Sequence, residues 1–181
     1  MNIHSDIESV LVSAQQLKER TRELADQINK DYNGEELVLI TLLKGGVMFA
    51  VDLMRMLDMP VDIDFMCASS YNSSTTSSGT IKIKKDIDCS IEGKNVLIAE
   101  DIIDSGMTLK YIVEMLKERN PKSIEICTIL DKPSRRKVDV DVKYVGFEIP
   151  DEFVVGYGLD YAQKHRNLPY VGILKRSVYE K

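Results

Sequence analysis

Apolar positions change their spacing along the chain, and each spacing predicts a different element. Between Ser13 and Asn33–Gly34 they recur every three to four residues, which is typical of an amphipathic helix. Ser13 and Gln16 have capping-box spacing at its start. Leu37 to Leu43 is a nearly continuous apolar run, as in a strand buried on both faces. A glycine turn and an apolar stretch at 47–57 follow, so strand, turn and helix are expected in that order.

The rest of the chain continues this alternation. Pro and Gly punctuate short apolar runs, and a helical pattern at 108–119 ends at Asn120-Pro121. Strands that alternate with helices predict an α/β fold around a mainly parallel central sheet flanked by helices. With no internal repeat or linker in view, residues 1–181 are predicted to form a single domain. The further strands are expected at 61–67, 80–84, 95–99, 123–130, 144–147, 153–155 and 170–174.

A polar tract at 69–79, rich in Ser and Thr, separates two of these strands. Such a composition cannot pack into a core, so the tract is expected to be a long loop. Long loops between strands often close over active sites as lids. A lid and a plain hairpin loop remain equal alternatives from the composition alone.

The charge of the chain bears on its partners and its location. Lys and Arg total 24 against 29 Asp and Glu, giving a net charge of −5 with both signs interspersed. A nucleic-acid-binding surface would need clustered basic residues, so no nucleic-acid partner is expected. The chain has no apolar run of about 18 residues and no signal-peptide pattern at its start. We therefore expect no membrane partner and a cytoplasmic location.

The most unusual chemistry follows the predicted strand at 95–99. Glu100 and Asp101 are adjacent carboxylates, and Asp104-Ser105-Gly106 follows just before a helix start. In α/β sheets, ligands bind beyond the carboxyl ends of the strands. Carboxylates there can hold Mg²⁺ and sugar hydroxyls, and the amides at a helix start suit a phosphate. Asp104 or Ser105 as a mere helix cap is the alternative, but it leaves Glu100 and Asp101 unexplained.

Two common nucleotide-binding motifs are missing. The chain contains no G-x-x-x-x-G-K-[ST] loop, which argues against a P-loop nucleotidase. It also contains no G-x-G-x-x-G at a helix start, so a dinucleotide-binding fold lacks its fingerprint.

The segment Val96-Leu97-Ile98-Ala99-Glu100-Asp101-Ile102-Ile103-Asp104-Ser105-Gly106-Met107-Thr108 resembles the phosphoribosyl pyrophosphate signature of the type I phosphoribosyltransferases, in the version carried by hypoxanthine-guanine phosphoribosyltransferases. Further blocks resemble this family in the right order, and together they span about residues 37 to 174. They are Leu42-Leu43-Lys44-Gly45-Gly46, Ser69-Ser70-Tyr71, Leu130-Asp131-Lys132-Pro133 and Phe153-Val154-Val155-Gly156-Tyr157-Gly158-Leu159-Asp160-Tyr161.

The resemblance implies a type I phosphoribosyltransferase fold with a small hood region and a flexible lid loop. It also implies transfer of a 5-phosphoribosyl group from phosphoribosyl pyrophosphate to N9 of hypoxanthine or guanine, with Mg²⁺ as cofactor. It suggests a homodimer or homotetramer, and it gives the Leu43-Lys44 peptide bond a cis conformation.

Site residues follow from the resemblance alone. Asp104 would be the general base. Glu100 and Asp101 would bind the ribose hydroxyls and magnesium, and Asp160 would lie by the purine as a second magnesium contact. His165, beside Arg166, has no role in the family and is expected to be a lone surface histidine. The other implied residues are Ser105, Gly106, Met107 and Thr108 at the 5′-phosphate, Lys44, Gly45 and Arg166 at pyrophosphate, Ser70 and Tyr71 in the lid, and Lys132, Phe153 and Val154 at the purine.

Two rival functions remain. An RNA-binding regulator of the same fold would need a basic face, and this chain is acidic overall. An enzyme of the same family could instead use adenine, orotate or uracil. Lys132 argues against adenine, because a cationic donor pairs well with a 6-oxo group and poorly with an exocyclic amine.

Overall fold

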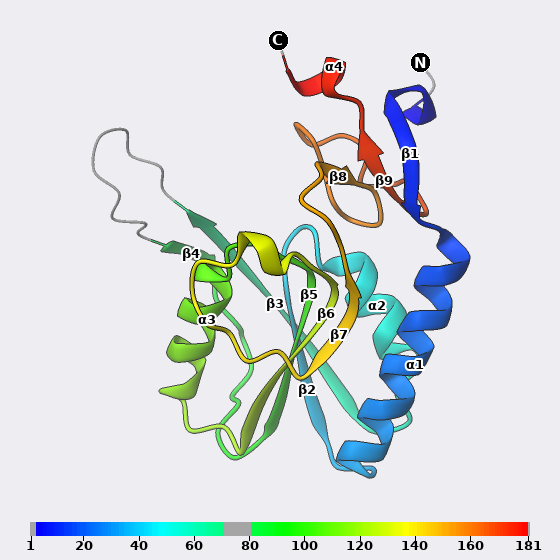
Figure 1. Ribbon diagram of the computed structural model, residues 1–181. Coiled ribbons are helices and arrows are strands. Elements are labelled where there is room, and N and C mark those ends of the chain that lie inside the picture. Colours follow the sequence, from blue (N-terminus) through cyan, green and yellow to red (C-terminus); the bar gives the residue numbers. More distant parts are fainter. Residues whose placement is uncertain (1–2, 71–80, 181) are drawn as a thin grey trace.

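The computed structural model describes residues 3–70 and 81–180. Its body is a six-stranded sheet with the strand order β4-β3-β2-β5-β6-β7 (Figure 1). Neighbouring strands run parallel except β4, which pairs antiparallel with β3 at one edge. The predicted α/β class with a mainly parallel sheet is confirmed. The strands are β2 (Leu37–Leu42), β3 (Val61–Ser70), β4 (Ile81–Lys85), β5 (Asn95–Ile103), β6 (Ser123–Asp131) and β7 (Tyr144–Glu148).

Helices cover both faces of this sheet. Helices α1 (Ala14–Tyr32) and α2 (Val47–Met54) lie on one face, and α3 (Met107–Lys117) lies on the other. Strand β2 shows why, because Leu37 and Leu39 pack with α1 and α2 while Val38 and Ile40 pack with α3. An uninterrupted apolar strand therefore serves two hydrophobic cores at once.

The predicted capping box of α1 is present. The Ser13 hydroxyl accepts from the Gln16 amide, the Gln16 side chain accepts from the Ser13 amide, and Asn33 ends the helix in the left-handed region at φ 48°. Helix α2 is shorter than predicted and ends at Met54. Strand β5 is longer than predicted and continues through Glu100 and Asp101, because β6 stays paired with it as far as Ile103.

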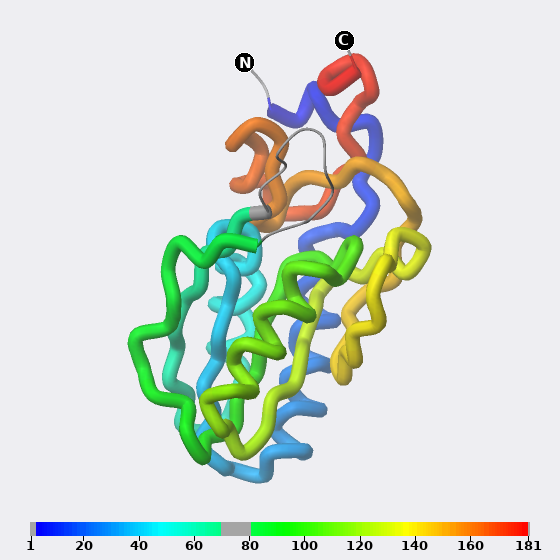
Figure 2. Tube along the Cα trace, turned by 90° about the vertical axis from the view of Figure 1, so that its left-hand side faces the viewer, coloured from blue at the N-terminus to red at the C-terminus, as the bar shows by residue number. Residues whose placement is uncertain are grey.

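A second, antiparallel sheet forms a hood above the carboxyl ends of the main strands (Figures 1 and 2). Its strands are β1 (Ile7–Val12), β9 (Val171–Leu174) and β8 (Val154–Val155), in that order. The sequence pattern did not predict β1, of whose residues only Val12 is buried and which show no clear alternation. Both described ends of the chain lie in the hood, which also carries the short helix α4 (Arg176–Tyr179).

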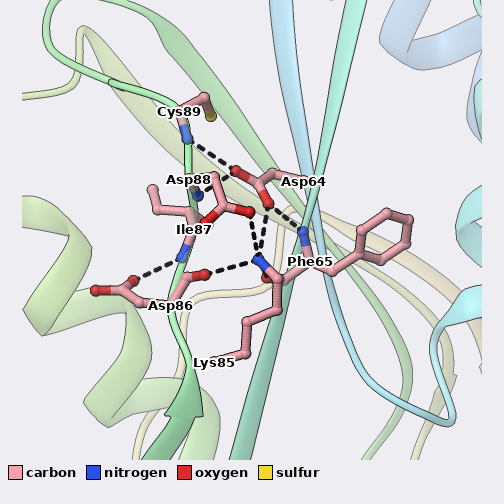
Figure 3. A network of polar contacts seen from close by, with 7 residues as sticks. All are labelled: Asp64, Phe65, Lys85, Asp86, Ile87, Asp88 and Cys89. Atoms are coloured by element: carbon pink, nitrogen blue, oxygen red, sulfur yellow. Dashed lines mark hydrogen bonds and ion pairs between the residues drawn. The ribbon is translucent and has the colours of Figure 1, made fainter.

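A polar network holds the edge of the main sheet together at Asp64 of β3 (Figure 3). The Asp64 carboxylate accepts hydrogen bonds from the backbone amides of Phe65 at 2.7 Å, Asp88 at 2.6 Å and Cys89 at 3.0 Å. The Lys85 ammonium lies 3.4 Å from the same carboxylate. Burial raises the pKa of Asp64, but these amide donors outweigh it and lower the pKa to about 2. The segment between β4 and β5 is thereby fixed to β3.

Helices that could cross a membrane are absent from the described ranges of the chain.

Candidate active site

Two buried carboxylates lie near the end of β5. Glu100 is 9% exposed and Asp101 is 7% exposed. Asp101 accepts from the Ile102 amide at 2.8 Å, whereas Oε2 of Glu100 is buried without a hydrogen-bond partner among the described residues. Burial, and then the neighbouring Asp101 charge, raise the pKa of Glu100 well above its usual value, and burial also raises the pKa of Asp101. Two buried carboxylates with so few donors would be stabilised by a cation or by hydroxyl donors from a bound ligand.

The start of α3 forms a second part of the site. Gly106 is the N-cap, and as a glycine it has no side chain to cap the helix. The Ser105 hydroxyl accepts a long hydrogen bond from the Met107 amide at 3.5 Å. Ser105 therefore caps the helix only weakly, and this contact leaves the buried Glu100 and Asp101 unexplained. First-turn amides with so weak a side-chain acceptor suit a phosphate, together with the positive end of the helix dipole.

A cleft joins these two features, and we call it the α3 cleft. Its lining brings residues from the β2–α2 turn to the end of β5 and the start of α3. A site at the carboxyl end of parallel strands is thereby formed as the sheet topology predicts. Its polar and glycine residues are Gly45, Glu100, Asp104, Ser105, Gly106 and Thr108.

The turn after β2 approaches the acidic pair closely. The Leu43–Lys44 peptide bond is cis, as the family resemblance implies. A Cβ on Gly45 would lie 1.7 Å from Oδ2 of Asp101, and a Cβ on Gly158 would lie 2.0 Å from the Gly45 carbonyl oxygen. Only glycine fits at either position, and Gly158 also has a φ of 101°. The turn is thus packed between the acidic pair and the hood.

The hood supplies a cation to this region. Arg166 forms an ion pair with Asp160 at 2.7 Å and donates to the Gly158 carbonyl at 2.7 Å. The Lys44 ammonium donates to the Gln163 side chain at 3.0 Å, and Gln163 also accepts from Arg166 at 3.4 Å. Lys44 and Arg166, far apart in the sequence, are therefore held on the same amide side chain.

A second cleft lies between the sheet and the hood, and we call it the Phe153 cleft. Phe153 is 39% exposed. Lys132 is only 7% exposed, and its ammonium donates to the Glu152 carbonyl at 2.6 Å. Burial lowers the pKa of Lys132. The negative charges of Asp104 and Asp151 raise it, but they do not offset the effect of burial. The lining is Ile102, Asp104, Lys132, Arg135, Asp151, Glu152, Phe153, Val154, Leu159 and Tyr179.

Asp104 and Ile102 line both clefts. The Asp104 carboxylate is half exposed and forms an ion pair with Arg135 Nε at 2.9 Å, and Arg135 also pairs with Asp151 at 3.2 Å. Exposed ion pairs of this kind contribute little to stability, so Arg135 can release Asp104 at small cost. One carboxylate therefore lies where a ligand in the α3 cleft would meet a ligand in the Phe153 cleft.

Comparison with known proteins agrees with this geometry. A family model described as a phosphoribosyl transferase domain matches residues 10–162. The hypoxanthine-guanine phosphoribosyltransferase of Bacillus subtilis is 52% identical over 175 residues, which are 97% of each protein. The chain belongs to the hypoxanthine-guanine phosphoribosyltransferase family.

Solved structures agree as well. A crystal structure of a Staphylococcus aureus hypoxanthine phosphoribosyltransferase has a TM-score of 0.95 and 51% identity, with 99% of this chain and 97% of that one covered. A Bacillus anthracis hypoxanthine-guanine phosphoribosyltransferase, solved with HEPES in its active site, has a TM-score of 0.90 and 51% identity, with 93% of this chain and 99% of that one covered. The phosphoribosyltransferase fold with a hood, implied by the resemblance, is thus confirmed.

Most of the residues that the phosphoribosyltransferase resemblance singled out are gathered by the structure into these two clefts and the turn beside them. Asp160 is not among the described residues that line either cleft, and its carboxylate is paired with Arg166 and also accepts from the Gln163 amide at 2.8 Å. The lid assignment remains a prediction. Ser70 ends β3, and Tyr71, like the rest of the tract to Thr80, lies outside the described residues.

The expectation that His165 is a surface residue is wrong. His165 is 3% exposed, and its Nε2 lies 3.5 Å from the Asp6 carboxylate. Strand β1 and the 3₁₀ turn before it, Ile3–Asp6, bring the start of the chain into the hood, where Asp6 lies beside His165. The contact joins residues 6 and 165, which no local sequence pattern relates.

Three residues of the site were missed by sequence reasoning. Arg135 stands close to the Lys132 block, so basic residues beside that block were an available signal. Gln163 and Tyr179 had no such signal. Both reach the site only through the folding of the hood.

Proposed function

We propose that Asp104 is the general base in the reaction of this chain, a purine salvage enzyme of the hypoxanthine-guanine phosphoribosyltransferase family. The reaction joins N9 of hypoxanthine or guanine to the anomeric carbon of phosphoribosyl pyrophosphate, and it releases pyrophosphate with IMP or GMP. The observation that carries the proposal is that Asp104 lines both clefts. A carboxylate there can accept the proton that the purine loses as the new bond forms.

The α3 cleft would bind phosphoribosyl pyrophosphate. The 5′-phosphate would accept from the first-turn amides of α3 and from hydroxyls beside them, with Ser105, Gly106, Met107 and Thr108 forming the cradle. Glu100 and Asp101 would accept from the ribose hydroxyls. Pyrophosphate would lie at the Lys44-Gly45 turn, where Arg166 is close enough to share the Gln163 side chain with Lys44.

The Phe153 cleft would bind the purine. The Phe153 ring offers an exposed surface for stacking, and Val154 adds its backbone at the edge of the base. The Lys132 ammonium has three donors, of which the Glu152 carbonyl takes one. The others can donate to the 6-oxo group, so the cleft favours hypoxanthine and guanine over adenine.

Magnesium fits the acidic residues of the site. Mg²⁺ prefers a few carboxylates completed by substrate oxygens and water, and the buried unpaired oxygen of Glu100 lies beside Asp101. No group of three His, Cys, Asp or Glu among residues 3–70 and 81–180 could hold the ion alone. Glu100 and Asp101 would therefore hold it together with the substrate, and Asp160 would offer a second contact. When bound, the ion neutralises the developing charge of pyrophosphate.

The RNA-binding regulator has no observation in its favour. Its basic surface would have to form on a chain whose net charge is −5. The homodimer or homotetramer and the closing of residues 70–71 over the substrates stay predictions from the family resemblance. The cytoplasmic location stays a prediction from the sequence pattern.

The test is a spectrophotometric assay of purified protein with phosphoribosyl pyrophosphate and each base, run with magnesium and again with EDTA. We expect turnover of hypoxanthine and guanine that requires magnesium, and none with adenine, orotate or uracil. Turnover of adenine would contradict the role of Lys132. Absence of any turnover, together with salt-dependent RNA binding, would favour the regulator.

A further inference from the structure

The last helix of the chain carries an aromatic residue into the Phe153 cleft. Tyr179 of α4 stacks on Phe153, with ring centroids 4.9 Å apart and planes inclined by 23°. Tyr161 meets the edge of Phe153 at 5.7 Å and 86°, and it meets Tyr179 at 6.5 Å and 63°. These three rings form one aromatic cluster, of which Phe153 and Tyr179 line the cleft. None of the motifs that resemble the family includes Tyr179.

Backbone contacts fix the position of Tyr179 although it lies close to the chain end. The Leu174 amide donates to the Phe153 carbonyl at 2.8 Å, which sets the register of β9 beside Phe153. The Lys175 amide donates to the Asp6 carbonyl at 2.9 Å, and the Val178 amide donates to the Lys175 carbonyl at 2.9 Å. Tyr179 is also partly buried against the hydrophobic cluster of the hood. These contacts therefore hold the Tyr179 ring beside Phe153.

The exposure of Phe153 indicates which surface of its ring is available. Tyr179 stacks on one face and Tyr161 packs against one edge, yet 39% of Phe153 stays exposed in the described structure. Because Tyr179 covers one face, a ligand that stacks on Phe153 in this arrangement would take the opposite face. Lys132 lines the same cleft, so a base on that face would lie within the cleft that holds its proposed donor.

We propose that Tyr179 is a positioning residue for the purine, acting through Phe153. Its ring packs on the back of Phe153 and holds that side chain in the orientation on which a 6-oxopurine stacks. The proposal rests on the proposed function, in which the purine stacks on Phe153. Because a fixed ring loses little rotational freedom when the base binds, the effect falls on base affinity. A stacked aromatic pair of this kind corresponds to about a 2- to 10-fold effect.

The test compares the Michaelis constants of three Tyr179 variants. We expect Tyr179→Ala to raise KM for hypoxanthine and for guanine by about 2- to 10-fold, with kcat and KM for phosphoribosyl pyrophosphate within about 2-fold of the parent. Tyr179→Phe keeps the ring and should match the parent. Tyr179→Leu keeps apolar contact without a flat ring and should resemble Tyr179→Ala, which covers the case in which the alanine variant folds poorly.

Tyr170→Ala is the matched control. Tyr170 belongs to the same hood cluster and contacts His4, with its hydroxyl 2.7 Å from Nδ1, but it is not among the described residues that line the Phe153 cleft. A general loosening of the hood would raise KM for the bases in this variant too, and that result would overturn the proposal. An unchanged KM in both Tyr179→Ala and Tyr179→Leu would overturn it as well. A lowered KM would instead show that Tyr179 competes with the base for Phe153.

The parent protein separates this inference from the proposed function. If the parent turns over hypoxanthine and guanine and only the variants depart from expectation, the inference fails and the proposed function stands. If the parent turns over no 6-oxopurine, the proposed function fails first.

Discussion

Asp64 and Glu100 are both buried carboxylates on strands of the same sheet, but their surroundings are opposite. Asp64 is 7% exposed and accepts from three backbone amides, with the Lys85 ammonium nearby (Figure 3). Glu100 is 9% exposed and has one oxygen without a partner among the described residues, beside the charge of Asp101. The pKa of Asp64 is lowered to about 2, and the pKa of Glu100 is raised.

The difference separates a structural carboxylate from one that awaits a ligand. Burying a charge costs free energy unless hydrogen bonds replace the lost water. At Asp64 the protein supplies those hydrogen bonds itself, so the charge stabilises the fold. At Glu100 it supplies too few, which fits the proposal that bound substrate and metal provide the remaining partners. Burial alone would not distinguish the two residues, because their exposed fractions are nearly equal.

The largest effect is expected at Asp104, the proposed general base, whose carboxylate is half exposed. We predict that Asp104→Asn lowers kcat by about 10² or more, because the amide cannot accept the proton of the purine. Initial rates with saturating substrates measure this loss. Asp151→Asn is the matched control, since Asp151 pairs with the same arginine. Equal losses in both variants would assign the effect to Arg135 and not to a general base.

Glu100→Gln tests the unpaired member of the comparison. Loss of a charged acceptor for substrate hydroxyls or metal should lower kcat/KM for phosphoribosyl pyrophosphate by roughly 10- to 100-fold. The same change should raise the free energy of unfolding of the ligand-free protein by about 1 kcal/mol, because a buried and poorly partnered charge is removed. Rate measurements and urea titration provide the two readouts. If the variant loses both activity and stability, Glu100 has a structural role like that of Asp64, and the prediction is wrong.

Asp64→Asn should give the reverse result. Lowering the pKa from its usual value to about 2 corresponds to about 2 kcal/mol of folding free energy, which the neutral amide loses. Activity at 25 °C should stay near that of the parent, because Asp64 lies outside both clefts in the described structure. Asp62→Asn, on the same strand with a 56% exposed side chain paired to Lys94, is the control and should change stability little. Comparable destabilisation by both variants would refute the special role of Asp64.

The last prediction concerns the pH dependence of the Asp64 contribution to stability. A carboxylate whose pKa is depressed in the folded state contributes stability that is fully present above the unfolded pKa near 4, and that contribution is lost as pH falls toward about 2. The stability difference between the parent and Asp64→Asn should therefore shrink from about 2 kcal/mol toward zero over this window. Urea titrations at several pH values measure it. A difference that stays constant from pH 5 to pH 2 would show that Asp64 acts through packing and not through its charge.

Strand β3 shows where sequence reasoning stopped. The alternation of apolar and polar residues correctly predicts a strand at 61–67, but it gives no sign that Asp64 is buried. In the structure Asp64 and Met66 are the more buried positions. The amides of Asp88 and Cys89 make burial of a carboxylate possible, and they belong to a segment more than 20 residues away.

The sequence by itself determined the elements and the chemical identity of the site. Helical spacing, the Ser13 capping box and the buried strand runs are local properties, since each depends on residues a few positions apart. The acidic segment at 100–104 could also be found locally, because carboxylates directly after an apolar strand are costly unless they serve a ligand.

Only the tertiary structure decided which side chains meet. Asp64 gained its amides, His165 became buried beside Asp6, and Tyr179 came to stack on Phe153 through contacts between distant parts of the chain. The placement of Asp104 at the junction of two clefts likewise required the hood to fold over the sheet. Such contacts depend on strand order and register, which local spacing does not encode.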